Sequence, residues 1–81
     1  MAATRKEVDG WIESAKENKI SYILSVCDTW DYDDYPIFCK DLNELTEAYY
    51  KHDNVNMQRI NEIINIEGDK VTEGLRINSL I

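Results

Sequence analysis

The stretch ISYILSVC, residues 20–27, constrains the fold more than any other part of this sequence. It is rich in β-branched and aromatic side chains, which favours an extended strand. Alternation along that strand would place on one face Ile20, Tyr22, Leu24 and Val26, and on the other Ser21, Ile23, Ser25 and Cys27. We expect the even-numbered face to pack against the first helix. The mixed odd-numbered face indicates partial exposure or cover from a partner.

Such a strand needs neighbours, and two later stretches supply them. YPIFC, residues 35–39, reads as a second strand with Pro36 at its start or on an edge. The two strands form a predicted antiparallel hairpin with a wide acidic loop. A two-stranded sheet alone is marginally stable, so we expect a third strand over residues 60–66.

The hairpin also predicts where the two cysteines lie. If its loop is centred near Asp33, Cys27 lies across from Cys39 and a cross-strand disulfide is geometrically conceivable. A cytoplasmic protein keeps its thiols reduced, however. We therefore favour two small apolar side chains that fill a narrow gap.

Two segments carry helix signals. Thr4 and Glu7 form a capping box before the apolar residues Val8, Trp11, Ile12 and Ala15, which predicts a helix that ends near Asn18. Asp41 and Glu44 begin a second helix, whose buried stripe is Leu42, Leu45 and Tyr49 and which ends around residues 52–54.

Together these elements predict an α+β fold in the order α-β-β-α-β, a small antiparallel sheet with two helices packed on one face. We expect one domain over residues 1–81, with a core at 4–67 and a C-terminal extension at 68–81. The extension would add a short strand or an ordered tail. A chain of this size supports one modest core, worth roughly 5 kcal/mol, so a homo-oligomer that buries more surface is also considered.

The charge of the chain narrows its partners. Nine basic residues against sixteen acidic ones give a net charge of −7. This charge disfavours direct binding to nucleic acid or to an anionic membrane, because both need a positive patch. It suits solubility, or docking on a basic surface of another protein. The sequence has neither a signal peptide nor an apolar run near the roughly 20 residues of a membrane span, and we expect a cytoplasmic protein.

We find little in the sequence that predicts chemistry. His52 is the one histidine, and pairs with Cys27 or Cys39 are the only nucleophile–base combinations left open. The aspartates of residues 28–34 lack the spacing and the glycine of a calcium loop, and the three glycines form no phosphate cradle. We therefore expect no enzymatic activity, no metal site and no cofactor.

The stretch CDTWDYDDY, residues 27–35, is the candidate contact surface. Its aromatic rings offer large contact area at low entropic cost, and its carboxylates pair with arginine and steer a basic partner. We expect Tyr35 to turn inward and Trp30 to be exposed. The candidate partner-binding residues are Asp28, Trp30, Asp31, Tyr32, Asp33 and Asp34. The alternative is a solvated loop whose aromatic side chains pack on the sheet.

Two stretches, VCDTWDYDDYPIF and NMQRINEI, resemble a family of small proteins encoded by bacteriophages and prophages. The shared features are a Cys-Asp-Thr-aromatic core, an acidic Tyr-Pro segment and a Met-Gln-Arg patch ahead of the last strand. The resemblance covers most of residues 4–67. It implies a phage source, and hence the cytoplasm of a bacterial host cell, more than a particular mechanism.

A phage source favours three kinds of non-enzymatic function. The first is an inhibitor of a bacterial defence system, such as the anti-CRISPR proteins whose carboxylates occupy a nucleic-acid channel of a basic host protein. The second is an oligomeric sponge for a nucleotide immune signal, with Trp30 or Tyr32 stacked on a base and Arg59 at a phosphate. The third is a regulatory or structural interaction module of the phage.

Overall fold

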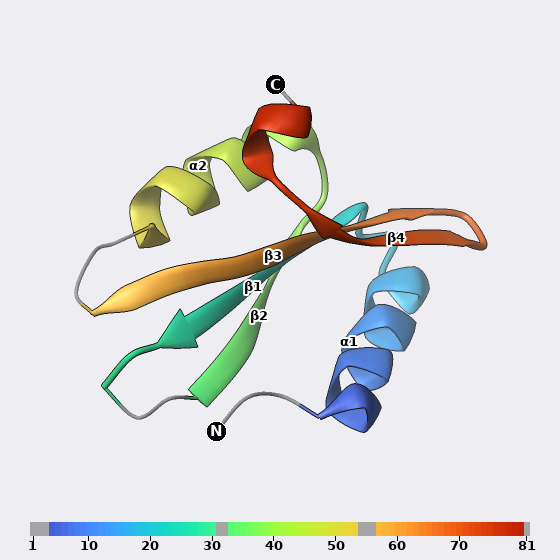
Figure 1. The fold of residues 1–81 in the computed structure, drawn as a ribbon. Helices are drawn as coiled ribbons and strands as arrows, with labels where there is room; N and C mark the ends of the chain where they lie inside the picture. Colours follow the sequence, from blue (N-terminus) through green and yellow to red (C-terminus); the bar gives the residue numbers. More distant parts are fainter. Residues whose placement is uncertain (1–3, 31–32, 54–56, 81) are drawn as a thin grey trace.

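The computed structural model describes residues 4–30, 33–53 and 57–80. Its elements are α1 (Arg5–Glu17), β1 (Tyr22–Asp28), β2 (Asp33–Cys39), α2 (Leu42–His52), β3 (Gln58–Glu67), β4 (Lys70–Leu75) and the short 3-10 helix η1 (Ile77–Ser79). The four strands form one antiparallel sheet in the spatial order β2-β1-β3-β4 (Figure 1). The predicted α+β class is confirmed, and the C-terminal residues add a fourth strand to the three that we expected.

The two helices cover opposite faces of the sheet (Figure 1). On one face, Ile12 and Ala15 of α1 belong to a core cluster with Ile23, Ile64 and Ile66. On the other face, Leu45 of α2 belongs to a second cluster with Leu24, Val26, Cys39, Ile63 and Ile77. The prediction of both helices on one face is therefore wrong. The even-numbered face of β1 meets α2, and α1 packs on the odd-numbered face.

The physical reason is that the central strands are apolar on both faces. Ile23 and Leu24 of β1 are fully buried, although alternation sends their side chains to opposite sides. Ile63 and Ile64 of β3 repeat this arrangement, at 1% and 0% exposure. Strands that are covered on both faces read as continuous apolar runs, and such runs require a helix on each side.

Both helices begin where the capping signals place them. The Thr4 hydroxyl accepts a hydrogen bond from the Glu7 amide at 3.2 Å, and the Asp41 carboxylate accepts one from the Glu44 amide at 2.9 Å. The Glu44 carboxylate in turn accepts the Lys40 amide at 2.7 Å, one residue before the cap. These bonds satisfy backbone donors that the first helical turn leaves without partners.

The register of the hairpin separates the two cysteines. Cys39 lies across from Tyr22, and Cys27 lies across from Asp34. The prediction that Cys27 faces Cys39 is wrong, because the turn lies between Asp28 and Asp33 and is not centred on Asp33. Both residues are buried free thiols. Cys39 belongs to the core under α2, and Cys27 shares the opposite face of the sheet with Ile23.

The C-terminal residues pack on the same core as the rest of the chain. β4 pairs with β3, and Ile77 is buried in the cluster under α2, where Leu75 and Leu80 pack against it. Arg5 of α1 forms ion pairs with Asp9 at 2.6 Å and with Glu73 of β4 at 2.8 Å. Val71 of β4 also packs against the cluster under α1, so residues 70–80 contribute to the packing on both faces of the sheet.

Candidate functional site

The two stretches that carry the predicted contact residues lie at the same end of the sheet. We call this end the loop end. Where described, it comprises residues 28–34, from the end of β1 to the start of β2, and residues 57–61, at the start of β3. Asp28 pairs with Asp33 on β2 and with Gln58 on β3, and Cys27 pairs with Arg59. The Cys-Asp-Thr-Trp and Met-Gln-Arg stretches, about thirty residues apart in the sequence, thus lie side by side.

Thr29 connects these two stretches directly. Its amide and its hydroxyl both donate hydrogen bonds to the carbonyl oxygen of Met57, at 2.7 and 2.5 Å. Met57 has a φ of 64°, in the left-handed region that residues other than glycine rarely adopt. The two bonds hold the backbone of Met57 in this conformation while its side chain remains 54% exposed.

Trp30 follows Thr29 in the turn and is the most exposed large apolar side chain of the described residues, at 72%. Its amide donates to the Asp28 carboxylate at 2.9 Å, a local turn that fixes the backbone but leaves the ring in solvent. The expected exposure of Trp30 is confirmed. Two exposed apolar side chains, Trp30 and Met57, are thus presented from turns whose backbones are hydrogen-bonded to each other.

Three of the described aspartates lie at the same end of the sheet. Asp33 is exposed, whereas Asp28 and Asp34 are half-buried. The Asp34 carboxylate accepts a hydrogen bond from the Asn61 side chain at 2.9 Å, which reaches across β1 from β3. Asp31 and Tyr32, which were also predicted to bind a partner, lie outside the described residues.

Tyr35 turns inward as expected, and its ring packs against the core under α2. Burial raises the pKa of its hydroxyl, and the negative charge of Asp28 raises that pKa further. The aromatic side chains of the segment therefore divide between two roles. Tyr35 secures β2 to the core, and Trp30 is left for contact.

Arg59 is exposed on β3 beside Cys27. It therefore adds a positive charge to the edge of an otherwise acidic surface. This position is compatible with the phosphate contact that the nucleotide alternative requires.

The thiols are not arranged as activated nucleophiles. Burial raises the pKa of Cys27, and a hydrogen bond to Asp34 raises it further, which outweighs the opposing charge of Arg59. Burial also raises the pKa of Cys39 to about 11, with contributions from Glu44 and Asp41. Reactive cysteines need the opposite shift, because the thiolate is the nucleophile.

His52 lies on the α2 side, where its Nδ1 atom is 2.8 Å from the Gln58 side-chain oxygen. Cys27 belongs to the α1 side of the sheet, so the sheet lies between this thiol and the imidazole. Cys39 and His52 do border one shallow hollow beside α2, but the raised pKa of the thiol disfavours the thiolate there.

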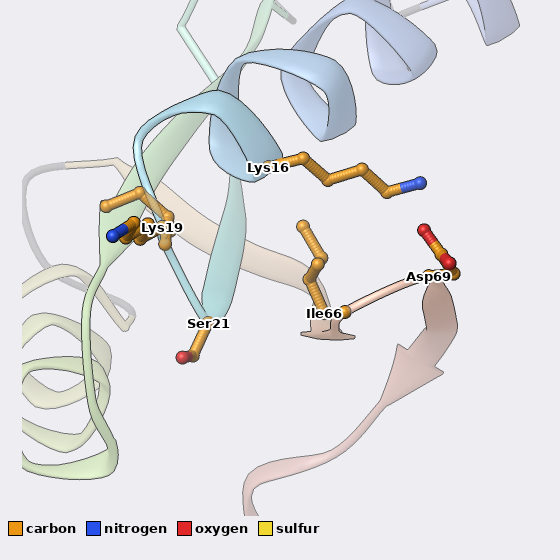
Figure 2. Close-up of a pocket in the computed structure, with 7 residues that line it drawn as sticks. Lys16, Lys19, Ser21, Ile66 and Asp69 are labelled. Atoms are coloured by element: carbon orange, nitrogen blue, oxygen red, sulfur yellow. The ribbon is translucent and has the colours of Figure 1, made fainter.

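A second surface hollow, which no sequence pattern predicted, lies at the end of α1, away from the loop end. Its volume is about 440 Å³, and it is lined by Lys16, Lys19, Ile20, Ser21, Ile66, Gly68 and Asp69. Lys16 extends on the same side as Asp69, and Lys19 lies on the other side (Figure 2). The acidic side chain and the carbonyl end of α1 both oppose an anion at this hollow.

Comparisons with protein-family models, with curated proteins and with solved structures find no match to this chain. In the part of the chain that the structure describes, no helix is long and apolar enough to cross a membrane. Thr29, Met57 and Asn61 are the residues of the loop end that sequence reasoning missed. Met57 carried one signal, since it begins the Met-Gln-Arg stretch, residues 57–59, on which the expected family resemblance partly rests.

Proposed function

We propose that this chain acts by stoichiometric binding, and that its loop end docks on a basic surface of a host protein. The observation that carries the proposal is the exposure of Trp30 and Met57 from two mutually hydrogen-bonded turns, among the carboxylates of Asp28, Asp33 and Asp34. Tryptophan is enriched among residues that dominate binding energy, and methionine adapts its shape to a partner. The carboxylates would steer a positively charged partner during encounter.

The class of partner follows from the phage resemblance together with the charge. An acidic chain with a net charge of −7 suits a basic nucleic-acid site of a bacterial defence protein, and occupation of that site would inhibit it. We therefore propose an anti-defence inhibitor of the anti-CRISPR kind that acts in the host cytoplasm. Support for this step is the resemblance of residues 26–38 and 56–63, together with the acidic surface.

The test is affinity capture from bacterial lysate with the immobilised chain and matched variants. Trp30→Ala removes the exposed ring of the loop end, and Tyr50→Ala removes a ring on α2 that is also well exposed, at 63%. Truncation of a hot-spot residue to alanine costs at least about 2 kcal/mol of binding free energy, so we expect the affinity of Trp30→Ala for the partner to fall roughly thirtyfold. Tyr50→Ala should capture the same protein as the unchanged chain.

Capture at different salt concentrations and with charge variants tests the electrostatic contribution to partner binding. Capture should weaken between 0.1 and 0.5 M salt, as expected for partly exposed charges at a protein interface. Asp33→Asn should weaken it more than Asp69→Asn, which removes the same charge from the exposed turn between β3 and β4. A partner retained equally by all these variants would exclude the loop end as the docking surface.

Arg59 favours a second candidate, the nucleotide sponge, because its exposed guanidinium lies at the same end as Trp30. A base stacked on the indole and a phosphate at Arg59 would use both side chains. Thermal unfolding with cyclic and ADP-ribose-derived nucleotides separates the two candidates. A rise in melting temperature that Arg59→Gln abolishes, without any captured protein, would favour the sponge. If neither ligand class binds, the phage interaction module gains support.

A further inference from the structure

The outer edge of β2 differs between its two halves. In the described part of the chain, β1 is the only strand that pairs with β2. Its first half contains two aspartates and Pro36, the charges and the proline with which sheets protect an edge from pairing. Its second half, residues 37–39, is apolar, and Phe38 is 42% exposed. The edge is therefore open only beyond Pro36.

A hollow lies on each face of the sheet beside this open half. The hollow on the α2 side, about 300 Å³, is lined by Ile37, Phe38, Cys39, Glu44, Glu47, Ala48, Lys51 and His52. The hollow on the α1 side, about 170 Å³, is lined by Ser14, Asn18, Ile20 and Phe38. A strand added to an edge sends successive side chains to alternate faces, so it would enter both hollows in turn.

We propose that residues 37–39 at the edge of β2 bind an extended peptide segment of a partner as a fifth strand, with apolar and basic side chains in alternation. The apolar side chains would lie on the α1 side against Ile20 and Phe38. The basic side chains would lie on the α2 side, with their methylene stems over Ile37 and Ala48. Their charged ends would reach Glu47 and the Oε1 atom of Glu44, whose Oε2 atom accepts the Lys40 amide.

Charge identifies the occupant as a basic segment. Glu44 and Glu47 are both exposed on the rim of the α2-side hollow, and Lys51 and His52 lie further along α2 in the same hollow. This order places a bound cation toward the start of α2. A second copy of the chain would bring a net charge of −7 against an equal one, with its own glutamates at the seam. A basic peptide meets the opposite charge.

This site lies beyond the proposed docking of the loop end and uses none of its residues. The probe is the peptide acetyl-Lys-Val-Lys-Val-Lys-Val-amide. The controls are the same peptide with glutamate in place of lysine and one with alternate backbone amides N-methylated. Binding is followed by NMR titration and amide hydrogen exchange. We expect the lysine peptide alone to bind, and to slow exchange of at least one outward-facing amide among residues 37–39.

Charge reversal localises the peptide on the surface. Glu47→Lys should weaken its binding by about tenfold or more, whereas Asp69→Lys, with the same change in net charge, should change it by less than about threefold. Phe38→Ser should weaken binding in the same way and leave Trp30-dependent capture unchanged. The proposal would be overturned by equal loss of binding in both charge variants, by equal binding of the N-methylated peptide, or by unchanged exchange at residues 37–39. A concentration-dependent dimer that buries these amides would also overturn it.

Discussion

The carbonyl oxygen of Met57 accepts two hydrogen bonds from Thr29, one from its amide at 2.7 Å and one from its hydroxyl at 2.5 Å. Thr29 thereby links the two turns that carry the exposed side chains of the loop end, Trp30 and Met57. It precedes Trp30 in the chain and it holds Met57 across the sheet. Substitutions at Thr29 and at Met57 should therefore affect the stability of the fold and the binding of a partner differently.

Replacement of Thr29 by valine tests the hydroxyl bond. Valine keeps the shape and the amide bond but removes the donor to the Met57 carbonyl. A typical hydrogen bond contributes about 1 kcal/mol, so we expect the free energy of unfolding to fall by roughly that amount, with weaker capture of the partner. Urea unfolding measures the first effect. Thr29→Ser, which keeps the hydroxyl, should lose less than half as much.

Replacement of Met57 by glycine separates stability from function. Its φ of 64° strains any residue with a Cβ atom, and glycine adopts this conformation without that strain. We expect Met57→Gly to raise the free energy of unfolding by up to about 1 kcal/mol, while the loss of an exposed apolar side chain weakens partner binding.

Lys19 provides the matched control for the Met57 prediction. It has a φ of 56° and lies in the connection between α1 and β1, away from the loop end. Lys19→Gly should stabilise the fold to a similar extent and leave partner binding unchanged. Weaker binding in both variants would mean that the loss at Met57 is not specific to its side chain.

Sequence patterns predicted both helices and the first three strands of this fold, but they left β4 open and did not assign the faces correctly. The caps at Thr4 and Asp41 depend on contacts within four residues, so the starts of both helices could be predicted from local sequence. The choice of face depends on which helix reaches which side of β1. That outcome is set by long-range packing, which the alternation in residues 20–27 does not encode.

The loop end shows the same division. The exposure of Trp30 could be predicted because a short acidic turn cannot bury so large a ring. The role of Met57 could not, because it depends on a register between β1 and β3 that includes a shift between Ser25 and Val26. No local pattern fixes that shift, and it brings the Met57 carbonyl within reach of Thr29.

Conservative substitutions in β3 test the burial of both faces of the sheet. Ile63→Val removes one methylene from the core under α2, and Ile64→Val removes one from the core under α1. We expect each to lower the free energy of unfolding by about 1 kcal/mol, because both side chains are almost fully buried. Urea unfolding of the two variants checks this. If either were close to neutral, one face of the sheet would be less well packed than the structure indicates.

The buried thiol of Cys39 predicts a loss of stability in alkaline solution. Its pKa rises from an ordinary value of 9.0 to about 11 in the folded chain. Between these values the unfolded chain releases a proton that the folded chain retains, so the free energy of unfolding falls as the pH rises from about 9 to about 11. Below pH 9 this contribution is fully present, and it is worth on the order of 2 kcal/mol. Urea unfolding at several pH values measures it.

Burial also raises the pKa of Cys27 and that of Tyr35, so these groups contribute to the same alkaline fall in stability. The contribution of Cys39 is therefore measured by comparing the slope of the free energy of unfolding against pH in Cys39→Ala with that of the unchanged chain. Cys39→Ala should flatten the alkaline fall, whatever it costs in packing at neutral pH. Cys27→Ala should retain the part that comes from Cys39. Identical slopes for the unchanged chain and Cys39→Ala would show that this thiol ionises as easily in the fold as in the unfolded chain, and hence that water reaches it beneath α2.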